Sequence, residues 1–221
     1  MDVAGGHTGP LGIDREQSRR DFLKTAAWTG AALSAMGIGG FGVAVSRAKA
    51  QAAPYATYQG LGDAAILQFA YQLELLEGIF YDEGVKAGIF VDNFLVSIAA
   101  IRDHEFAHAD AIAATLVELG AEVPATPDFT YPEGVFADAV PFLQLAATLE
   151  PVGIGAYQGA APALESKDIL AAAISIHNAE CQHRSAINAM NLIFPPNNLA
   201  LEEALPLGAV QEAVAPFGIT G

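Results

Sequence analysis

Two segments of this chain combine the spacing of a helix-bundle core with side chains that such a core ordinarily excludes. In the first segment, the residues at alternating spacings of four and three are apolar except for Glu105 and His108. A later segment has the same spacing, with Glu180 and His183 as its polar residues. Residues at this spacing share one face of an α-helix, which packs against partner helices. The expected core positions are Phe94, Ile98, Ile101, Glu105, His108, Ile112 and Leu119 in the first segment, and Ile169, Ala173, Ile176, Glu180, His183, Ile187 and Met190 in the second. The pattern predicts an all-α bundle with two Glu-x-x-His pairs inside it.

Four long helices are expected in total, with approximate ranges 63–84, 92–119, 138–157 and 167–190. Asp63 and Asp92 are good N-caps for the first two helices, and Gly84 and Gly88 are expected to end the first. Pro151 lies inside the third helix and is expected to kink or break it. A short amphipathic stretch at 210–214 is expected to pack on the bundle.

The connection between the second and third helices is long and has no helical periodicity. Residues 120–136 include three prolines. At roughly 3.3 Å per extended residue, this segment can run the roughly 30 Å length of a 20-residue helix. The sequence therefore predicts a four-helix bundle made of two antiparallel helix pairs joined by one long crossover, with a short C-terminal helix.

The two halves of the bundle carry the same polar pattern at nearly constant distance. Glu74 and Tyr81 recur 76 residues later, and Glu105 and His108 recur 75 residues later. In a helix, each Glu and the Tyr seven residues after it lie on one face. The repeated set is Glu74, Tyr81, Glu105, His108, Glu150, Tyr157, Glu180 and His183.

The repeat also separates these residues from neighbours of similar chemistry. Glu77 shares the face of Glu74, but its counterpart is Gly153, so Glu74 is preferred as a site residue. His104 corresponds to Ala179 and is expected behind the site or facing solvent. His177, one turn before Glu180, is expected to hydrogen-bond a site carboxylate, while Tyr81 and Tyr157 are expected to be core residues around the site.

Four carboxylates inside a bundle repel one another and lose hydration, which costs several kcal/mol each unless they are neutralised. Two divalent cations would balance the four negative charges, and two neutral imidazoles would complete their coordination. Oxygen-rich ligation with imidazole suits iron or manganese, and zinc is also compatible. The pattern of one Glu from each of two helices and one Glu-x-x-His from each of the others is typical of di-metal carboxylate bundles.

Four segments carry a resemblance to a known family: LQFAYQLELLEGIFY at 67–81, HEFAHADAI at 104–112, LEPVGIGAYQGAAP at 149–162 and ILAAAISIHNAECQH at 169–183. With them the chain resembles the ferritin-like superfamily, and most closely its exported branch related to plant desiccation-related proteins. The resemblance implies a ferritin-like four-helix bundle with two iron or manganese ions. It implies Glu74, Glu105, His108, Glu150, Glu180 and His183 as the metal ligands, with Glu105 and Glu180 bridging the metals.

The activity is open between two interpretations. One is an oxidase, ferroxidase or peroxide-detoxifying enzyme of stress protection, with O2 or peroxide as its partner. The other is a structural stress or desiccation protein whose metal site only stabilises the bundle or is vestigial. Both need the same buried ligands, so the sequence does not separate them.

A third interpretation is a zinc metalloprotease, because residues 104–108 match HExxH. In that case His104, His108 and Glu150 would bind zinc and Glu105 would be the general base. This interpretation leaves Glu180 and His183 without a role and places the motif inside a bundle with no evident substrate cleft.

The N-terminus predicts export. Ser18-Arg19-Arg20-Asp21-Phe22-Leu23-Lys24 precedes a weakly apolar run and Ala48-Lys49-Ala50, which is the pattern of a twin-arginine signal cleaved after residue 50. An uncleaved membrane anchor is the alternative, and the glycines of the run argue against it. The expected domains are therefore a signal at 1–50 and a bundle at 51–221, in the periplasm, cell envelope or extracellular space.

Charge limits the partners of the exported part. Residues 51–221 contain four Lys or Arg against 21 Asp or Glu, a net charge of −17. Nucleic acid and anionic membranes are excluded as expected partners by such a surface, whereas metal cations are favoured. The oligomeric state is left open by the sequence.

Overall fold

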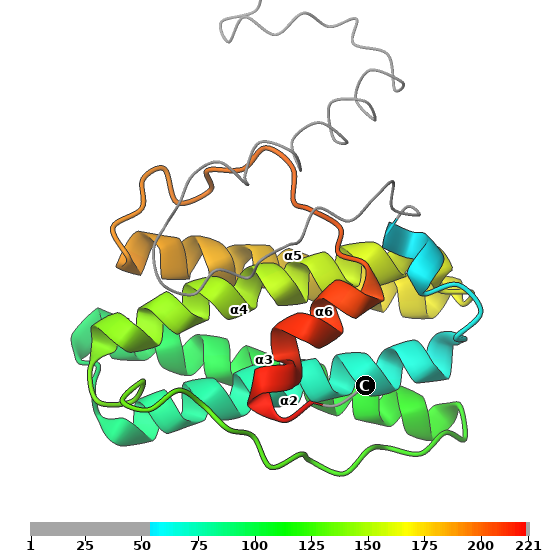
Figure 1. Ribbon diagram of the computed structural model, residues 1–221, viewed down its shortest axis with the longest axis horizontal. Coiled ribbons are helices and arrows are strands. Elements are labelled where there is room, and N and C mark those ends of the chain that lie inside the picture. Colours follow the sequence, from blue (N-terminus) through cyan, green and yellow to red (C-terminus); the bar gives the residue numbers. More distant parts are fainter. Residues whose placement is uncertain (1–53, 220–221) are drawn as a thin grey trace, which may run out of the picture. The chain divides into compact units, whose positions relative to one another are not determined.

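The computed structural model describes residues 54–219, and all the regular secondary structure within that range is helical, as expected. The predicted export signal at 1–50 lies outside the described residues. Four long helices are followed by a short one, and Figure 1 shows their arrangement. The elements are the 3-10 turn η2 (Pro54–Thr57), the helices α2 (Asp63–Ala87), α3 (Asp92–Glu118) and α4 (Ala139–Ala160), the turn η3 (Ala161–Ala163), the helices α5 (Lys167–Met190) and α6 (Leu207–Val214), and the turn η4 (Ala215–Phe217).

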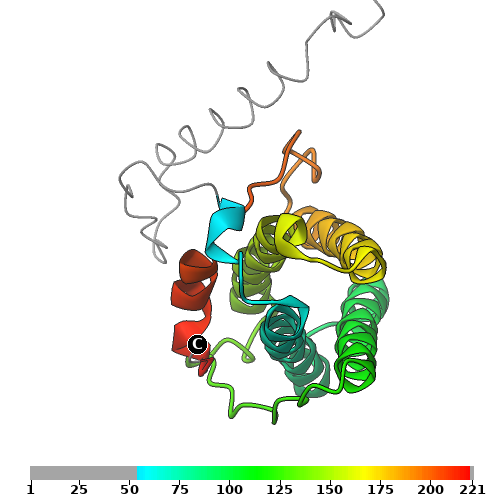
Figure 2. The same ribbon diagram turned by 90° about the vertical axis from the view of Figure 1, so that its right-hand side faces the viewer.

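The four long helices surround a common axis, which Figure 2 shows from one end of the bundle. Helix α2 packs mainly on α3, and α4 packs mainly on α5. The segment between α3 and α4 runs along the outside of the bundle (Figure 1), where the Tyr131 hydroxyl donates to the Leu76 carbonyl at 2.8 Å. The predicted topology of two helix pairs joined by a long crossover is confirmed.

The first two helices begin differently from the prediction. Gly62 precedes α2 at the N-cap position, and Asp63 is the first helical residue. Its carboxylate instead accepts hydrogen bonds from the backbone N–H groups of Glu165 at 2.8 Å and Ser166 at 2.9 Å, which fixes the start of α5 to the start of α2. Asp92 is likewise the first residue of α3 and not its cap. Both aspartates were wrongly predicted as caps, and in the case of Asp63 the side chain binds backbone donors elsewhere in the fold.

The prediction that Gly84 ends the first helix is also wrong. Helix α2 continues to Ala87 and ends at Gly88, whose φ of 67° is left-handed. A Cβ atom on Gly84 would lie 2.2 Å from the Phe142 ring. Gly84 therefore provides space for an aromatic ring from α4 and does not terminate the helix.

Pro151 does not break α4, which is continuous from Ala139 to Ala160. An interior proline costs about 3 kcal/mol in an isolated helix. Here Pro151 is exposed, while Leu149, Glu150 and Ile154 on either side of it are buried. Packing of these neighbours offsets the missing backbone hydrogen bond, so the helix is retained.

Most of the expected core positions are buried, but Phe94 and Leu119 are 46% and 47% exposed, so their prediction is wrong. A straight α-helix rotates about 20° per heptad relative to a 3.5-residue repeat. Leu119, two heptads after Glu105, is therefore turned about 40° away from the core face. Phe94 instead lies in the first turn of α3, where residues 91–94 are all exposed. Leu116, which is fully buried, replaces Leu119 at the C-terminal end.

Helix α6 and its flanking segments cover α4, with Val210 and Val214 in the main core cluster. The Leu205 N–H donates to the Gly155 carbonyl at 2.9 Å. A Cβ atom on Gly159 would lie 2.1 Å from the Leu205 carbonyl oxygen, so this close crossing needs glycine. The predicted amphipathic C-terminal stretch thus forms a helix that packs on the bundle.

One helical segment among the described residues, Ala139–Ala163, is long and apolar enough to cross a membrane, with a mean hydropathy of 1.3. More than half of this segment is buried inside the bundle, and it contains the buried carboxylate of Glu150. A core helix of a bundle has the same composition, and that is the role of this segment here.

Candidate metal centre

Each of the four long helices places polar side chains in the core at the middle of the bundle. The residues Glu74, Glu105, Glu150, Glu180 and His183 are all at most 3% exposed. The side chain of His108 is 13% exposed. The structure therefore brings together the six glutamates and histidines of the sequence repeat.

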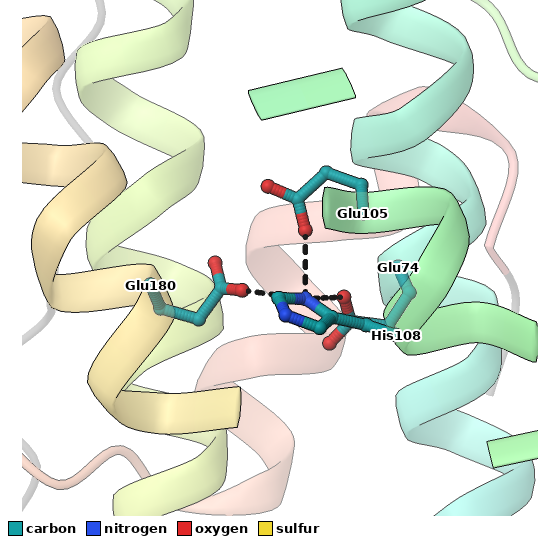
Figure 3. Close-up of side chains that lie close together, drawn as sticks. All are labelled: Glu74, Glu105, His108 and Glu180. Atoms are coloured by element: carbon teal, nitrogen blue, oxygen red, sulfur yellow. Dashed lines mark hydrogen bonds and ion pairs between the residues drawn. The ribbon is translucent and has the colours of Figure 1, made fainter. Parts of the chain in front are cut away.

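The first group surrounds His108, as Figure 3 shows. The ring Nδ1 lies 3.0 Å from Glu74 Oε2, 3.3 Å from Glu105 Oε2 and 3.1 Å from Glu180 Oε1. Ligand atoms of these four residues all lie within 4.8 Å of one another. Three carboxylates from three helices thus converge on one imidazole nitrogen.

The second group surrounds His183. Its Nδ1 lies 2.8 Å from Glu105 Oε1, 3.7 Å from Glu180 Oε2 and 4.0 Å from Glu150 Oε2. Atoms of Glu105, Glu150 and His183 lie within 4.8 Å of one another. This second group is the counterpart of the first under the sequence repeat.

Glu105 and Glu180 belong to both groups. Glu105 directs Oε2 to His108 and Oε1 to His183, and Glu180 directs Oε1 to His108 and Oε2 to His183. Each of these carboxylates therefore spans two neighbouring positions. This is the geometry that a carboxylate needs to bridge two cations.

Glu74 and Glu150 each face one group only, and each is held by a tyrosine from the opposite half of the repeat. The Tyr157 hydroxyl donates to Glu74 Oε1, and the Tyr81 hydroxyl donates to Glu150 Oε1. In both cases the other carboxylate oxygen points toward a histidine. The tyrosines thus leave one oxygen of each carboxylate directed into the centre.

Several buried atoms of the centre lack a hydrogen-bond partner within the described residues. They are Glu105 Oε1, Glu150 Oε2, both carboxylate oxygens of Glu180, and His183 Nδ1. His183 Nδ1 is close to Glu105 Oε1, but the two are not aligned as a hydrogen bond. Unpaired buried polar atoms are rare in folded proteins, and these converge on a shared space. The donor set of carboxylates and imidazoles fits two metal ions there.

The outer carboxyl groups favour their neutral forms. Burial, followed by the nearby charge of Glu180, raises the pKa of both Glu74 and Glu150 well above the ordinary value of 4.5. A charged carboxylate loses its hydration in the bundle core, and the charge of Glu180 adds to this cost.

Glu105 and the two histidines form ion pairs. Burial acts to raise the pKa of Glu105, but the rings of His108 and His183 outweigh it and hold the pKa at about 2. Burial acts to lower the histidine pKa values, but the surrounding carboxylates raise that of His108 to about 12 and that of His183 to about 10. Protons therefore neutralise the metal-free centre, and divalent cations would displace them.

His104 is in neither group. Its Nδ1 lies 2.9 Å from Nε2 of His183, so it contacts the nitrogen of His183 that faces away from the carboxylates. Zinc binding through HExxH would require the rings of His104 and His108 to share one ion. Here each ring meets a different partner, and the geometry fits the interpretation of His104 as a residue behind the site.

His177 does not hydrogen-bond a site carboxylate, in contrast to the expectation. Its Nδ1 lies 4.0 Å from Cys181 Sγ, and its Nε2 is buried without a partner among the described residues. One helical turn separates His177 from Glu180, but the ring extends toward Cys181 on its own helix.

Glu77, which the repeat excluded, is also buried in the core beside the two groups. It is 6% exposed, and burial, followed by the charge of Glu150, raises its pKa well above 4.5. Its position one helical turn after Glu74 was the available signal. The requirement for a matching residue in the second half removed it from the predicted set.

Residues 62–192 match the family model described as ferritin-like domain, and this range includes all the residues of the two groups. The match covers more than half of the chain. The chain therefore belongs to the ferritin-like domain family, as its sequence pattern predicted. A search of curated proteins finds no match to this chain.

Proposed function

We propose that this protein is an exported di-metal carboxylate protein that holds two iron or manganese ions in its bundle core and acts on O2 or peroxide in stress protection. The observation that carries the proposal is the orientation of Glu105 and Glu180, each of which directs its two oxygens to two different histidines. The ferritin-like fold and the buried carboxylate and histidine groups are compatible with such a site.

In this proposal, Glu74 and His108 hold one metal position, Glu150 and His183 hold the other, and Glu105 and Glu180 bridge them. The bridging pair comes from α3 and α5, so both positions depend on the packing of these two helices. Iron or manganese bound there would supply the electron transfer to O2 or peroxide.

The protein residues contribute orientation and the exclusion of water. Tyr81 and Tyr157 each hold one oxygen of an outer carboxylate, which leaves the second oxygen for a metal. The carboxylates lie in a core with at most 3% exposure, so a bound metal would have few water ligands. Such an environment strengthens electrostatic interactions inside the centre.

Metal content tests the proposal directly. Protein folded with manganese or ferrous iron is expected to retain two ions per chain by elemental analysis. The double variant Glu105→Ala, Glu180→Ala is expected to lose both, because it removes the bridging carboxylates. Glu118→Ala, an exposed position on the same helix as Glu105, is the matched control and should retain both ions. A double variant with a full complement of metal would refute the site.

The second candidate function is a metal-stabilised structural protein, which the near-complete burial of the centre favours. Oxygen uptake after addition of ferrous iron, and peroxide consumption by the manganese form, separate the two candidates. The enzymatic proposal expects either activity to depend on Glu105. Two bound metals without either activity would support the structural role.

The export part of the proposal rests on the sequence at residues 18–50. Arg19→Lys with Arg20→Lys is expected to leave the protein inside the cell, since twin-arginine transport depends on the arginine pair. Arg15→Lys, outside the motif, is the control. Export of the double variant at the level of the control would contradict this part and leave the metal site untouched.

A further inference from the structure

Glu77 lies midway between the two ends of the metal centre. Tyr81 on α2 reaches Glu150 on α4, and Tyr157 on α4 reaches Glu74 on α2, so the two helices run in opposite directions. Glu77 is one turn after Glu74 and about one turn before Tyr81. It therefore occupies a level between the two outer carboxylates, on the side of the centre formed by α2 and α4.

The carboxylate of Glu77 points toward the interior of the bundle. Its two oxygens lie 3.5 and 3.6 Å from the point where a Cβ atom on Gly153 would be, and Glu180 Oε2 lies 3.7 Å from the same point. Glu77 is 94% buried, since its exposure is 6%. Within residues 54–219, it makes no hydrogen bond or ion pair. A carboxylate this deeply buried is costly unless it is neutralised, and this one faces the same space as the carboxylate of Glu180.

Gly153 explains why the first half of the repeat has this glutamate and the second half does not. The two positions are counterparts, 76 residues apart in the repeat. A side chain longer than alanine at position 153 would meet the carboxylate of Glu77. Only one of the two equivalent positions can therefore carry a glutamate, and the repeat is broken at the place where its two halves face each other.

We propose that Glu77 is a fifth carboxylate ligand of the metal centre, which it enters from the α2–α4 side, opposite the bridging residues on α3 and α5. This inference rests on the proposed function. Four carboxylates balance two divalent ions, and a fifth leaves one negative charge in excess. Five carboxylates match a pair in which one ion is trivalent. Glu77 thus favours higher-valent metal and makes the two positions unequal.

Glu77→Gln tests the inference because it keeps the shape of the side chain and removes the charge. Titration with Mn²⁺ is expected to give two ions in the wild type. In the variant, affinity at one position is expected to fall by roughly tenfold or more, as for removal of groups that support metal ligands. Glu83→Gln, on the same helix with a side chain that is 45% exposed, is the matched control and should bind as the wild type does.

A second pair of variants separates ligation from packing. Glu77→Ala is expected to lose the same affinity, and adding Gly153→Glu is expected to restore it, because the repeat lets α4 supply the carboxylate. If Glu77→Ala and the double variant Glu77→Ala, Gly153→Glu lose metal affinity equally, with native helix content by circular dichroism, the effect is one of packing and the inference is overturned. Unchanged affinity in Glu77→Gln would also overturn it. A wild type that binds no metal would instead refute the proposed function.

Discussion

Replacing Tyr157 by phenylalanine removes a single buried hydroxyl group, which donates to Glu74 Oε1. Hydrogen bonds to charged groups contribute about 1.5–3 kcal/mol to stability, and those between neutral groups contribute about 0.5–1.5 kcal/mol. Burial, followed by Glu180, raises the pKa of Glu74, which favours the neutral acid in the metal-free protein. A metal ligand must be ionised. The variant should therefore cost about 1 kcal/mol without metal and about 2 kcal/mol with metal.

The difference can be measured by thermal unfolding. At about 2–4 °C per kcal/mol for a chain of this size, the Tm of Tyr157→Phe should fall by about 3 °C without manganese and about 6 °C with it. Tyr81→Phe should behave alike, because its hydroxyl donates to Glu150 in the same way. Tyr131→Phe is the control, since its hydroxyl donates to the neutral Leu76 carbonyl.

Two results would refute this reasoning. The first is an equal loss of Tm for Tyr157→Phe with and without manganese, which would show that the hydroxyl does not act on an ionised metal ligand. The second is a loss for Tyr131→Phe that increases with metal to the same extent. In that case the metal dependence would reflect the whole bundle and not the contact to Glu74.

Three further predictions concern pH, the histidine behind the site and the tail. The metal-free protein should lose stability as pH rises. The pKa of His183 is about 10 in the folded protein and 6.5 in the unfolded chain, so its contribution to stability is complete below pH 6.5 and is lost as pH rises through about 10. The raised pKa of Glu150 acts in the same direction above pH 4.5. With manganese bound, stability should instead increase with pH, because metal binding releases protons from the ligands. Calorimetry in buffers of different ionisation enthalpy would detect this release. His104→Ala should keep two metals with affinity lowered roughly tenfold, since it removes only the contact to His183 Nε2; complete loss of metal would instead favour the zinc protease motif. Gly159→Ala should lower the free energy of unfolding by about 1–3 kcal/mol, because the added Cβ would clash with the Leu205 carbonyl, and an unchanged denaturation midpoint would contradict that crossing.

The sequence was sufficient for the topology and for the principal residues of the centre. Glu105 and His108 occupy core positions of α3, and their repetition at Glu180 and His183 identified a two-part site. Pattern arguments of this kind succeed near the middle of a helix, where the core face is well defined. They failed at Phe94 because the first turn of α3 is exposed on every side, with residues 91–94 all open to solvent, and at Leu119 because the core face rotates over the length of α3.

The sequence did not predict the roles of residues whose function in the fold comes from contacts between helices. Glu77 was set aside because it does not recur in the second half, yet it faces the core. His104 was expected either behind the site or facing solvent, and only its contact to His183 decides between the two. Asp63 has the composition of a cap but binds the start of α5. A repeat identifies what two halves share, and it carries no information on where they differ.

The crossed tyrosine contacts have a consequence for how such a centre can change. Each helical hairpin supplies one outer glutamate, one bridging glutamate and one histidine, and its tyrosine completes the outer carboxylate of the other hairpin. Two identical hairpins could assemble the same six side chains by two-fold symmetry. A symmetric pair, however, would carry every substitution twice, and two copies of Glu77 would occupy the same space. Joining the hairpins in one chain through the crossover removes this restriction, so a single glutamate or a single histidine can be added to one side alone.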